Sequence, residues 1–195
     1  MYDDTLPFDT APLDKLAEVI VGTGLNLSPG QDVVLTASAE ALPLVRRVAK
    51  AAYRAGAGLV IPILSDEAVT RARYALGHDG TFDHAAGWLY EGMAKAYEGN
   101  AARLHIAADN PMALADMDPE RVATAAKATA AAYKPALAKI SGFEINWSIA
   151  AYPGRAWASQ VFPDLGTDAA QARLAEAIFA AARIDRADPV AAWAD

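Results

Sequence analysis

The feature that constrains the fold most is a pattern of strand, helix and strand in the first third of the chain. Residues 32–38, "DVVLTAS", form a short β-branched run that predicts a strand, and residues 59–64, "LVIPIL", predict a second one. Between them, apolar side chains recur at helical spacing until Gly56 and Gly58, which end the helix. Such a βαβ unit has two parallel strands joined by a right-handed crossover.

The same alternation continues along the chain and sets the expected fold class. Strands that alternate with helices indicate an α/β domain, in which a mainly parallel sheet carries helices on both faces in Rossmann-like or flavodoxin-like layers. Further strands are predicted at residues 102–108 and 144–152, and further helices at residues 12–22, 67–76, 81–100 and 166–184 and after Asp118.

Three prolines refine this picture. Pro62 lies inside the second predicted strand and cannot donate a ladder hydrogen bond, so that strand needs an edge position or a bulge. Pro119 follows Asp118, which is a strong helix start with an N-cap and a proline at the first helical position. Pro135 lies within the same helix, which we expect to be bent or broken there.

The composition excludes several classes of protein. The 195 residues fit one domain, and 24 acidic against 17 basic side chains leave no basic face for nucleic acid. The chain has 0 cysteines, which excludes disulfides, thiolate metal sites and cysteine nucleophiles. The first residues are acidic, unlike a signal peptide, and every apolar run is too short to span a membrane. We therefore expect a cytoplasmic protein that binds neither nucleic acid nor membranes.

No residue pattern in the chain predicts catalysis or metal binding. His78 and His84 are not spaced as two ligands on one helical face, and His105 alternates with apolar neighbours as a structural histidine would. The glycines at 22 and 24 precede the first strand, so they do not form the turn that cradles a pyrophosphate. The acidic groups Asp66-Glu67 and Asp116-Asp118-Glu120 lie at turns and helix starts, where acids cap helices. The sequence therefore predicts no catalytic or metal-binding residue in this chain.

One region is dense in aromatic side chains and arginine. Trp147, Tyr152, Arg155 and Trp157 lie close together in sequence, around the end of the last predicted strand and the loop after it. Because ligands of α/β domains bind beyond the carboxyl ends of parallel strands, these four residues are candidates for a binding cleft or a protein interface. The alternative is that the two tryptophans belong to the core.

Four segments resemble the metalloaminopeptidase family of aminopeptidase T, aminopeptidase S and PepS. The most specific parts are the "PGQ" turn before the first strand, "AYRAGA" at the end of the following helix, "WA…VFPD" and "DPVAAW". The likeness extends from Leu13 to Trp193, which is nearly the whole chain. The segments are residues 25–60, 117–137, 145–164 and 176–193.

The resemblance implies the function of a longer protein. Members of the family are about twice as long and remove N-terminal amino acids from peptides with two divalent metal ions, such as Co, Zn or Mg. Their metal ligands lie in the carboxyl-terminal half, which this chain does not resemble. The resemblance therefore implies that residues 1–195 form the N-terminal domain of a two-domain homodimeric enzyme, that this domain helps to enclose peptide substrates, and that it is inactive alone. Residues 186–195 would then begin the junction to the second domain.

Two other interpretations remain open on the sequence alone. In the first, the chain is a free-standing α/β module that binds a small molecule or a protein and lacks the catalytic half. In the second, it is a nucleotide-binding domain, although the loop after the first strand contains no glycine to cradle a phosphate. Within the family resemblance, Arg155 is a candidate for attracting the C-terminal carboxylate of short peptides.

Overall fold

A computed structural model describes residues 6–193 of the chain. Its strands are β1 (Val33–Ser38), β2 (Val60–Ser65), β3 (Ala102–Ala107) and β4 (Trp147–Ala151). Its α-helices are α1 (Ala11–Val19), α2 (Leu42–Arg54), α3 (Glu67–Leu76), α4 (Gly87–Glu98), α5 (Pro119–Ser141), α6 (Arg155–Val161) and α7 (Thr167–Ala181). Four short helical turns are η1 (Ile20–Gly24), η2 (Ala39–Ala41), η3 (Asp79–Thr81) and η4 (Ala191–Trp193).

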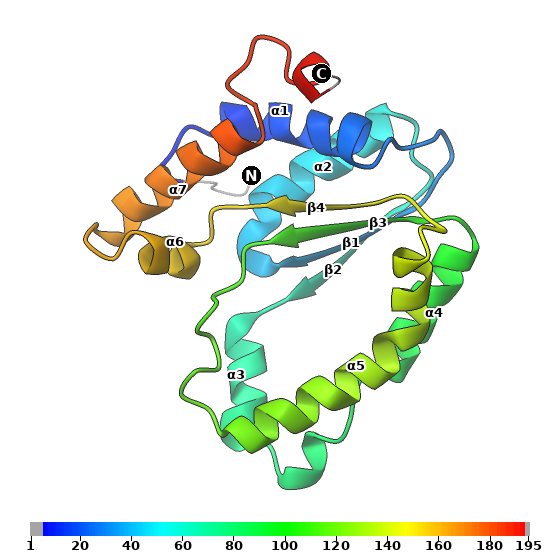
Figure 1. The fold of residues 1–195 in the computed structure, drawn as a ribbon, viewed down its shortest axis with the longest axis vertical. Helices are drawn as coiled ribbons and strands as arrows, with labels where there is room; N and C mark the ends of the chain where they lie inside the picture. The colour runs from blue at the N-terminus through cyan, green and yellow to red at the C-terminus, as the bar shows by residue number, and fades with distance from the viewer. Residues whose placement is uncertain (1–5, 194–195) are drawn as a thin grey trace.

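The four strands form one parallel sheet in the order β2-β1-β3-β4, which confirms the predicted fold class (Figure 1). Helices α1 and α2 cover one face, where Leu35 of β1 and Leu104 of β3 point into the larger core. Helices α4 and α5 pack on the other face, against Val34 and neighbouring side chains. Alternating residues of β1 therefore enter opposite cores, as the period of a strand requires.

Pro62 behaves as expected, because β2 is an edge strand. It lies opposite Leu35 of β1, and no described strand pairs with β2 on its other side. Because no described strand pairs with this outer side of β2, the missing N–H of proline costs no ladder hydrogen bond there.

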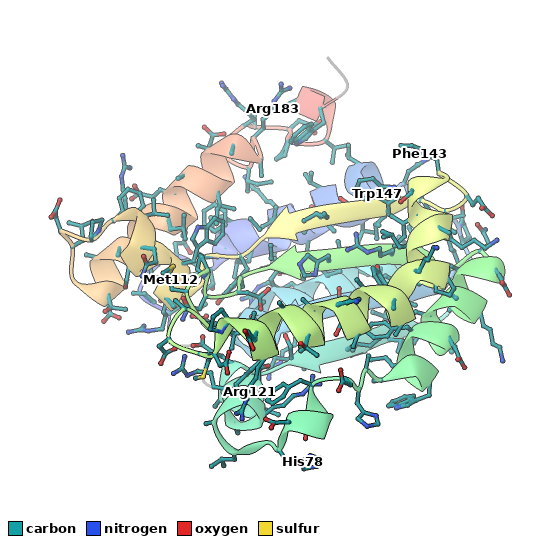
Figure 2. The ribbon with its side chains drawn as sticks, turned by 60° about the horizontal axis from the view of Figure 1, so that its bottom comes forward. His78, Met112, Arg121, Phe143, Trp147 and Arg183 are labelled. Atoms are coloured by element: carbon teal, nitrogen blue, oxygen red, sulfur yellow. The ribbon has the colours of Figure 1, made fainter. Side chains whose placement is uncertain are left out.

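Helix α5 runs unbroken through Pro135, and in Figures 1 and 2 its last turns lie at an angle to the rest, so the helix is bent, as one of the two expectations had it. Other helix boundaries differ from the sequence expectation. The helix predicted at residues 81–100 begins only at Gly87. The first helix ends in the π-helical turn Ile20–Gly24. Helix α6 was not predicted, because its seven residues are too short for a clear helical period. No described helix is long and apolar enough to cross a membrane.

A pair of amide side chains, from buried Gln31 and half-buried Asn146, ties the loops at the amino ends of three strands together. Gln31, which is 8% exposed, donates from Nε2 to the Asn100 carbonyl oxygen at 2.7 Å and to Asn146 Oδ1 at 2.6 Å. Its Oε1 accepts from the backbone N–H of Ser28 at 3.2 Å, and Asn146 Nδ2 donates to the Leu25 carbonyl oxygen at 2.6 Å. The glutamine of the "PGQ" turn thus holds the entries to β1, β3 and β4 in register.

Replacing Gln31 with leucine should lower the free energy of unfolding by about 2 kcal/mol, since the Asn146 side chain and the backbone groups of Ser28 and Asn100 each lose a hydrogen-bond partner. Urea denaturation followed by circular dichroism measures the change. Gln160→Leu on exposed α6 is the matched control and should cost less than about 0.5 kcal/mol. Equal effects of the two changes would contradict a structural role for the amide pair.

Candidate functional site

The structure places the four aromatic and arginine candidates in different surroundings. Trp147 begins β4 and packs with the core under α4 and α5. Tyr152 follows β4 and is fully buried in the opposite core. The Arg155 guanidinium pairs with Asp168 at 2.8 Å, and Trp157 packs against α7. The four do not form one cluster, and their role in a cleft or interface stays a prediction.

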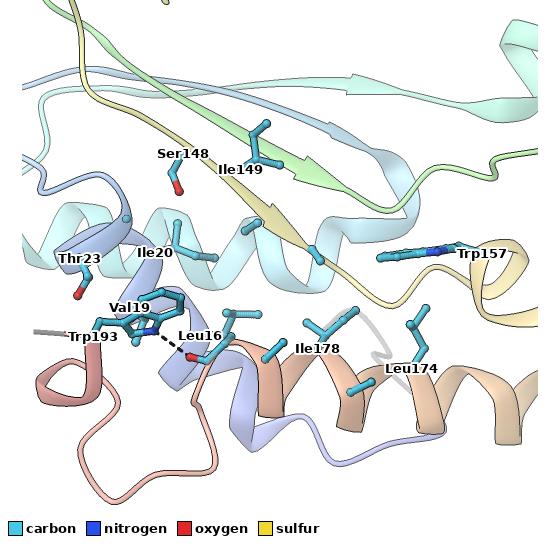
Figure 3. A pocket seen from close by; sticks show the side chains of 16 residues that line it. Leu16, Val19, Ile20, Thr23, Ser148, Ile149, Trp157, Leu174, Ile178 and Trp193 are labelled. Carbon is cyan, nitrogen blue, oxygen red and sulfur yellow. Dashed lines mark hydrogen bonds between the residues drawn. The ribbon is translucent and has the colours of Figure 1, made fainter. Parts of the chain in front are cut away.

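Trp157 lines an apolar groove at the edge of the sheet. The groove has a volume of about 560 Å³ and lies between β4, which is the other edge of the sheet, and helices α1 and α7 (Figure 3). Trp157 stands at one end and Trp193 at the other, where the Trp193 indole donates to the Ala182 carbonyl oxygen at 3.0 Å. Its lining contains hydroxyls of Thr23 and Ser148 and no titratable group. The groove offers apolar contact and no acid or base.

A second cavity lies at the carboxyl ends of β1, β2 and β3. This crevice, of about 250 Å³, includes the point where the strand order reverses between β1 and β3, the usual ligand position in open α/β sheets. Four carboxylates, from Glu40, Asp66, Glu67 and Asp109, line it. Burial raises the pKa of Glu40, and the negative charges of Glu67 and Asp109 raise it further.

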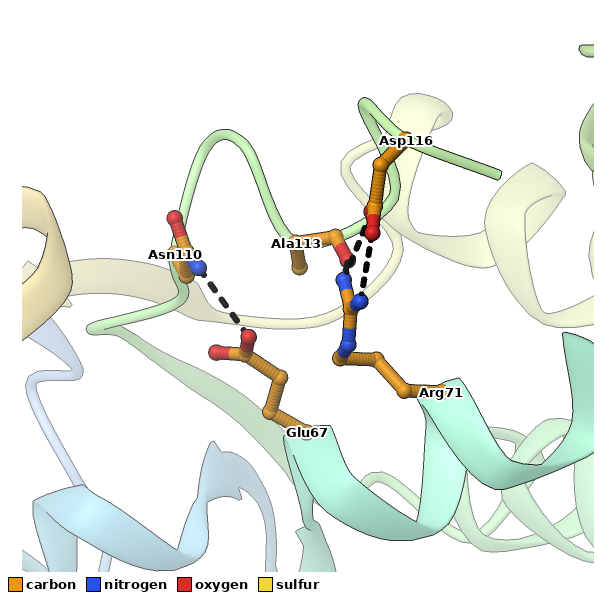
Figure 4. Close-up of polar contacts among 5 residues, drawn as sticks. All are labelled: Glu67, Arg71, Asn110, Ala113 and Asp116. Atoms are coloured by element: carbon orange, nitrogen blue, oxygen red, sulfur yellow. Dashed lines mark hydrogen bonds and ion pairs between the residues drawn. The ribbon is translucent and has the colours of Figure 1, made fainter. Parts of the chain in front are cut away.

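Contacts between α3 and the loop after β3 border this crevice (Figure 4). The Arg71 guanidinium binds both carboxylate oxygens of Asp116, at 2.7 and 2.8 Å, and this hydrogen bonding lowers the pKa of Asp116. Glu67 accepts from the Asn110 amide at 3.0 Å. Asp66 and Asp118 cap α3 and α5 as predicted, whereas Glu67 and Asp116 bridge segments that the sequence could not bring together.

The histidines and acids of the described residues do not fit a two-metal centre. No group of three or more such side chains within residues 6–193 is arranged to hold a metal ion. His105 lies half-buried on β3, with Nδ1 3.0 Å from Thr36 Oγ1, and burial together with the charge of Arg103 lowers its pKa. His78 lies apart, next to the turn η3 (Figure 2).

Comparison with known proteins gives a consistent result. Residues 9–195 match the family described as thermophilic metalloprotease (M29). The chain is 48% identical over 181 residues to aminopeptidase T of Thermus thermophilus and 32% identical over 189 residues to aminopeptidase PepS of Streptococcus thermophilus. The structure of wild-type AmpT from Thermus thermophilus superposes with a TM-score of 0.84 at 47% identity, covering 86% of this chain and 42% of that one.

The alignments cover nearly all of this chain but less than half of each relative. The alignment with aminopeptidase T covers 93% of this chain and 44% of the relative, and the PepS alignment covers 96% and 46%. The chain thus spans about half the length of the relatives it matches and corresponds to their N-terminal part. On its sequence and its fold, the chain belongs to the thermophilic metalloprotease family M29.

Proposed function

We propose that this chain is the N-terminal domain of a longer metal-dependent aminopeptidase, which removes N-terminal amino acids from peptides. The observation that carries the proposal is the match of nearly the whole chain to the N-terminal part of proteins named aminopeptidases, at up to 48% identity. Identity at this level over 181 residues supports a shared fold and a shared domain arrangement.

The proposed role of the domain is to enclose peptide substrates and to support a homodimer. Two features favour such a role: the free edge of β4 beside the apolar groove, and large apolar side chains at the surface, among them Val69, Leu76 and Phe143. A continuous apolar surface such as the lining of this groove is typical of positions where another domain or subunit packs. The acidic crevice would attract the free amino group of a peptide.

The rest of the aminopeptidase would bind the two divalent ions, with Co, Zn or Mg as candidates. Paired divalent ions lower the pKa of a bound water and polarise the scissile carbonyl. Since the described residues do not fit such a centre, we assign this chain binding and enclosure and no step of the hydrolysis. A cytoplasmic location also stays a prediction.

The 195-residue chain should therefore show no turnover of leucyl p-nitroanilide with Co²⁺, Zn²⁺ or Mg²⁺, whereas the longest product of its gene should hydrolyse this substrate. Release of nitroaniline, followed by absorbance, measures both. A preparation from cells without the gene controls for host peptidases. Metal-dependent turnover by the 195-residue chain above that background would overturn the assignment.

A free-standing α/β binding module is the second candidate, and the 560 Å³ apolar groove favours it. The source gene separates the two candidates. A coding region that continues with clustered His, Glu and Asp supports the aminopeptidase, whereas a stop codon directly after residue 195 supports the module.

A further inference from the structure

A third cavity lies between the sheet and the helices α4 and α5. It has a volume of about 430 Å³ and lies over the carboxyl halves of β1 and β2 and over Arg103 and His105 of β3. Most of its wall area is apolar, with Ile63 on the sheet and Leu89 and Met93 on α4. Tyr90 and Tyr133 meet edge to face there, at 5.4 Å between ring centroids. Such a concave apolar site suits the body of a small molecule.

Arg103 brings a positive charge into this cavity. It lies on the inner strand β3, between Val34 and Trp147 of the neighbouring strands, and its side chain lines the cavity. Within residues 6–193, the buried Nε atom has no hydrogen-bond partner, and no carboxylate lies within ion-pair distance of the guanidinium. Arg71, by contrast, binds both oxygens of Asp116. A partly buried guanidinium without a counterion is costly, and an anion would offset that cost.

The other polar groups of the cavity also favour a negatively charged ligand. The lining contains no Asp or Glu, and its hydroxyls come from Thr36, Ser65, Thr129 and the two tyrosines. His105 stands two residues beyond Arg103 on the same face of β3 and contacts Thr36. A cation would meet no opposite charge in this lining, whereas an anion would meet Arg103 and hydroxyl donors.

We propose that this cavity binds a small monocarboxylate with a branched apolar body, whose carboxylate pairs with the Arg103 guanidinium. Arginine binds a carboxylate through two parallel hydrogen bonds, and the apolar walls cover the rest of the ligand. A free amino acid fits less well, since its ammonium group would be left without a carboxylate partner in the described lining.

The probe is 4-methylvalerate, which has the shape of leucine without the ammonium group. Titrated into the 195-residue chain, it should shift the imidazole NMR signals of His105 saturably. It should also raise the pKa of His105, because a bound negative charge opposes the effect of Arg103; Asp109 is the acid that already acts in this direction. The uncharged 4-methylvaleramide and leucine should each bind at least about tenfold more weakly. Because this comparison uses the unmodified chain, it does not depend on whether a substituted chain folds.

Arg103→Gln should weaken 4-methylvalerate binding by about tenfold or more, and Arg103→Lys should weaken it less, because lysine keeps the charge and loses the planar pair of donors. Arg54→Gln, at an exposed position near the end of α2, is the matched control and should leave binding unchanged. No saturable shift, equal binding of the amide, or binding of inorganic phosphate alone would overturn the proposal.

The same titration on the longest product of the gene tests whether a carboxylate of the protein itself occupies the cavity. Retained binding there supports the small-molecule site. Loss of binding, with binding kept by the 195-residue chain, would show that a carboxylate of the protein pairs with Arg103, and would overturn the proposal. Because the readout is binding without turnover, the result is independent of the proposed aminopeptidase activity.

Discussion

Replacing Tyr152 with alanine should lower the free energy of unfolding by about 4 kcal/mol, in the range of large-to-small substitutions of buried aromatics. Tyr152 is 0% exposed, and its ring lies edge-on to Phe8 at 6.4 Å between centroids. Its backbone N–H donates to the Ala107 carbonyl oxygen at 2.9 Å, so the residue also continues the pairing of β4 with β3. Truncation would leave a cavity in the core under α1 and α2, where backbone contacts limit its collapse.

Urea denaturation of the purified chain measures this loss. The matched control is Trp88→Ala, which removes an aromatic side chain that is 77% exposed on α4 and should cost less than about 0.5 kcal/mol. A loss below about 1 kcal/mol for Tyr152→Ala would contradict its place in the core and favour a ligand-facing role.

Much of the fold follows from local patterns in the sequence. The βαβ unit was predicted because a β-branched run indicates a strand, and apolar residues at helical spacing followed by glycine indicate a helix and its end. Pro62 indicated an edge position or a bulge for a similarly local reason, because a missing N–H is tolerated where no second strand pairs, and β2 is an edge strand. The caps Asp66 and Asp118 were also visible, because a capping carboxylate accepts from a backbone N–H two or three residues away.

The cavities were not predicted, because distant segments form them. Glu40 accepts from the Arg155 backbone N–H at 2.6 Å across 115 positions, and Arg71 reaches Asp116 across 45. No local pattern reports such pairs. Arg103 did leave a signal: it is a charged residue in the alternating run "ARLHIA", on the face opposite the buried Leu104. A charge on an inner strand indicates a partner or a cavity on that face.

Replacing Gly154 with alanine should lower the free energy of unfolding by about 3 kcal/mol, since extra atoms in a packed site force the backbone to move. A Cβ at Gly154 would overlap the Ala108 carbonyl oxygen and lie 3.2 Å from Glu40 Oε2. Ala108 follows β3, Glu40 follows β1, and Gly154 immediately precedes α6. The absent side chain is therefore what lets these three segments meet at the carboxyl edge of the sheet.

Thermal or urea unfolding measures the loss for Gly154→Ala, and hydrogen exchange of the Arg155 amide locates it. That N–H donates to Glu40 Oε1 at 2.6 Å, so displacement of the loop should speed its exchange. Gly166→Ala is the matched control, because Gly166 likewise immediately precedes a helix, α7, and a Cβ there meets nothing within 4 Å. Equal stability of the two variants, or unchanged exchange at Arg155, would contradict this prediction. It would show that the backbone at Gly154 accommodates a methyl group and that close packing does not hold Glu40 there.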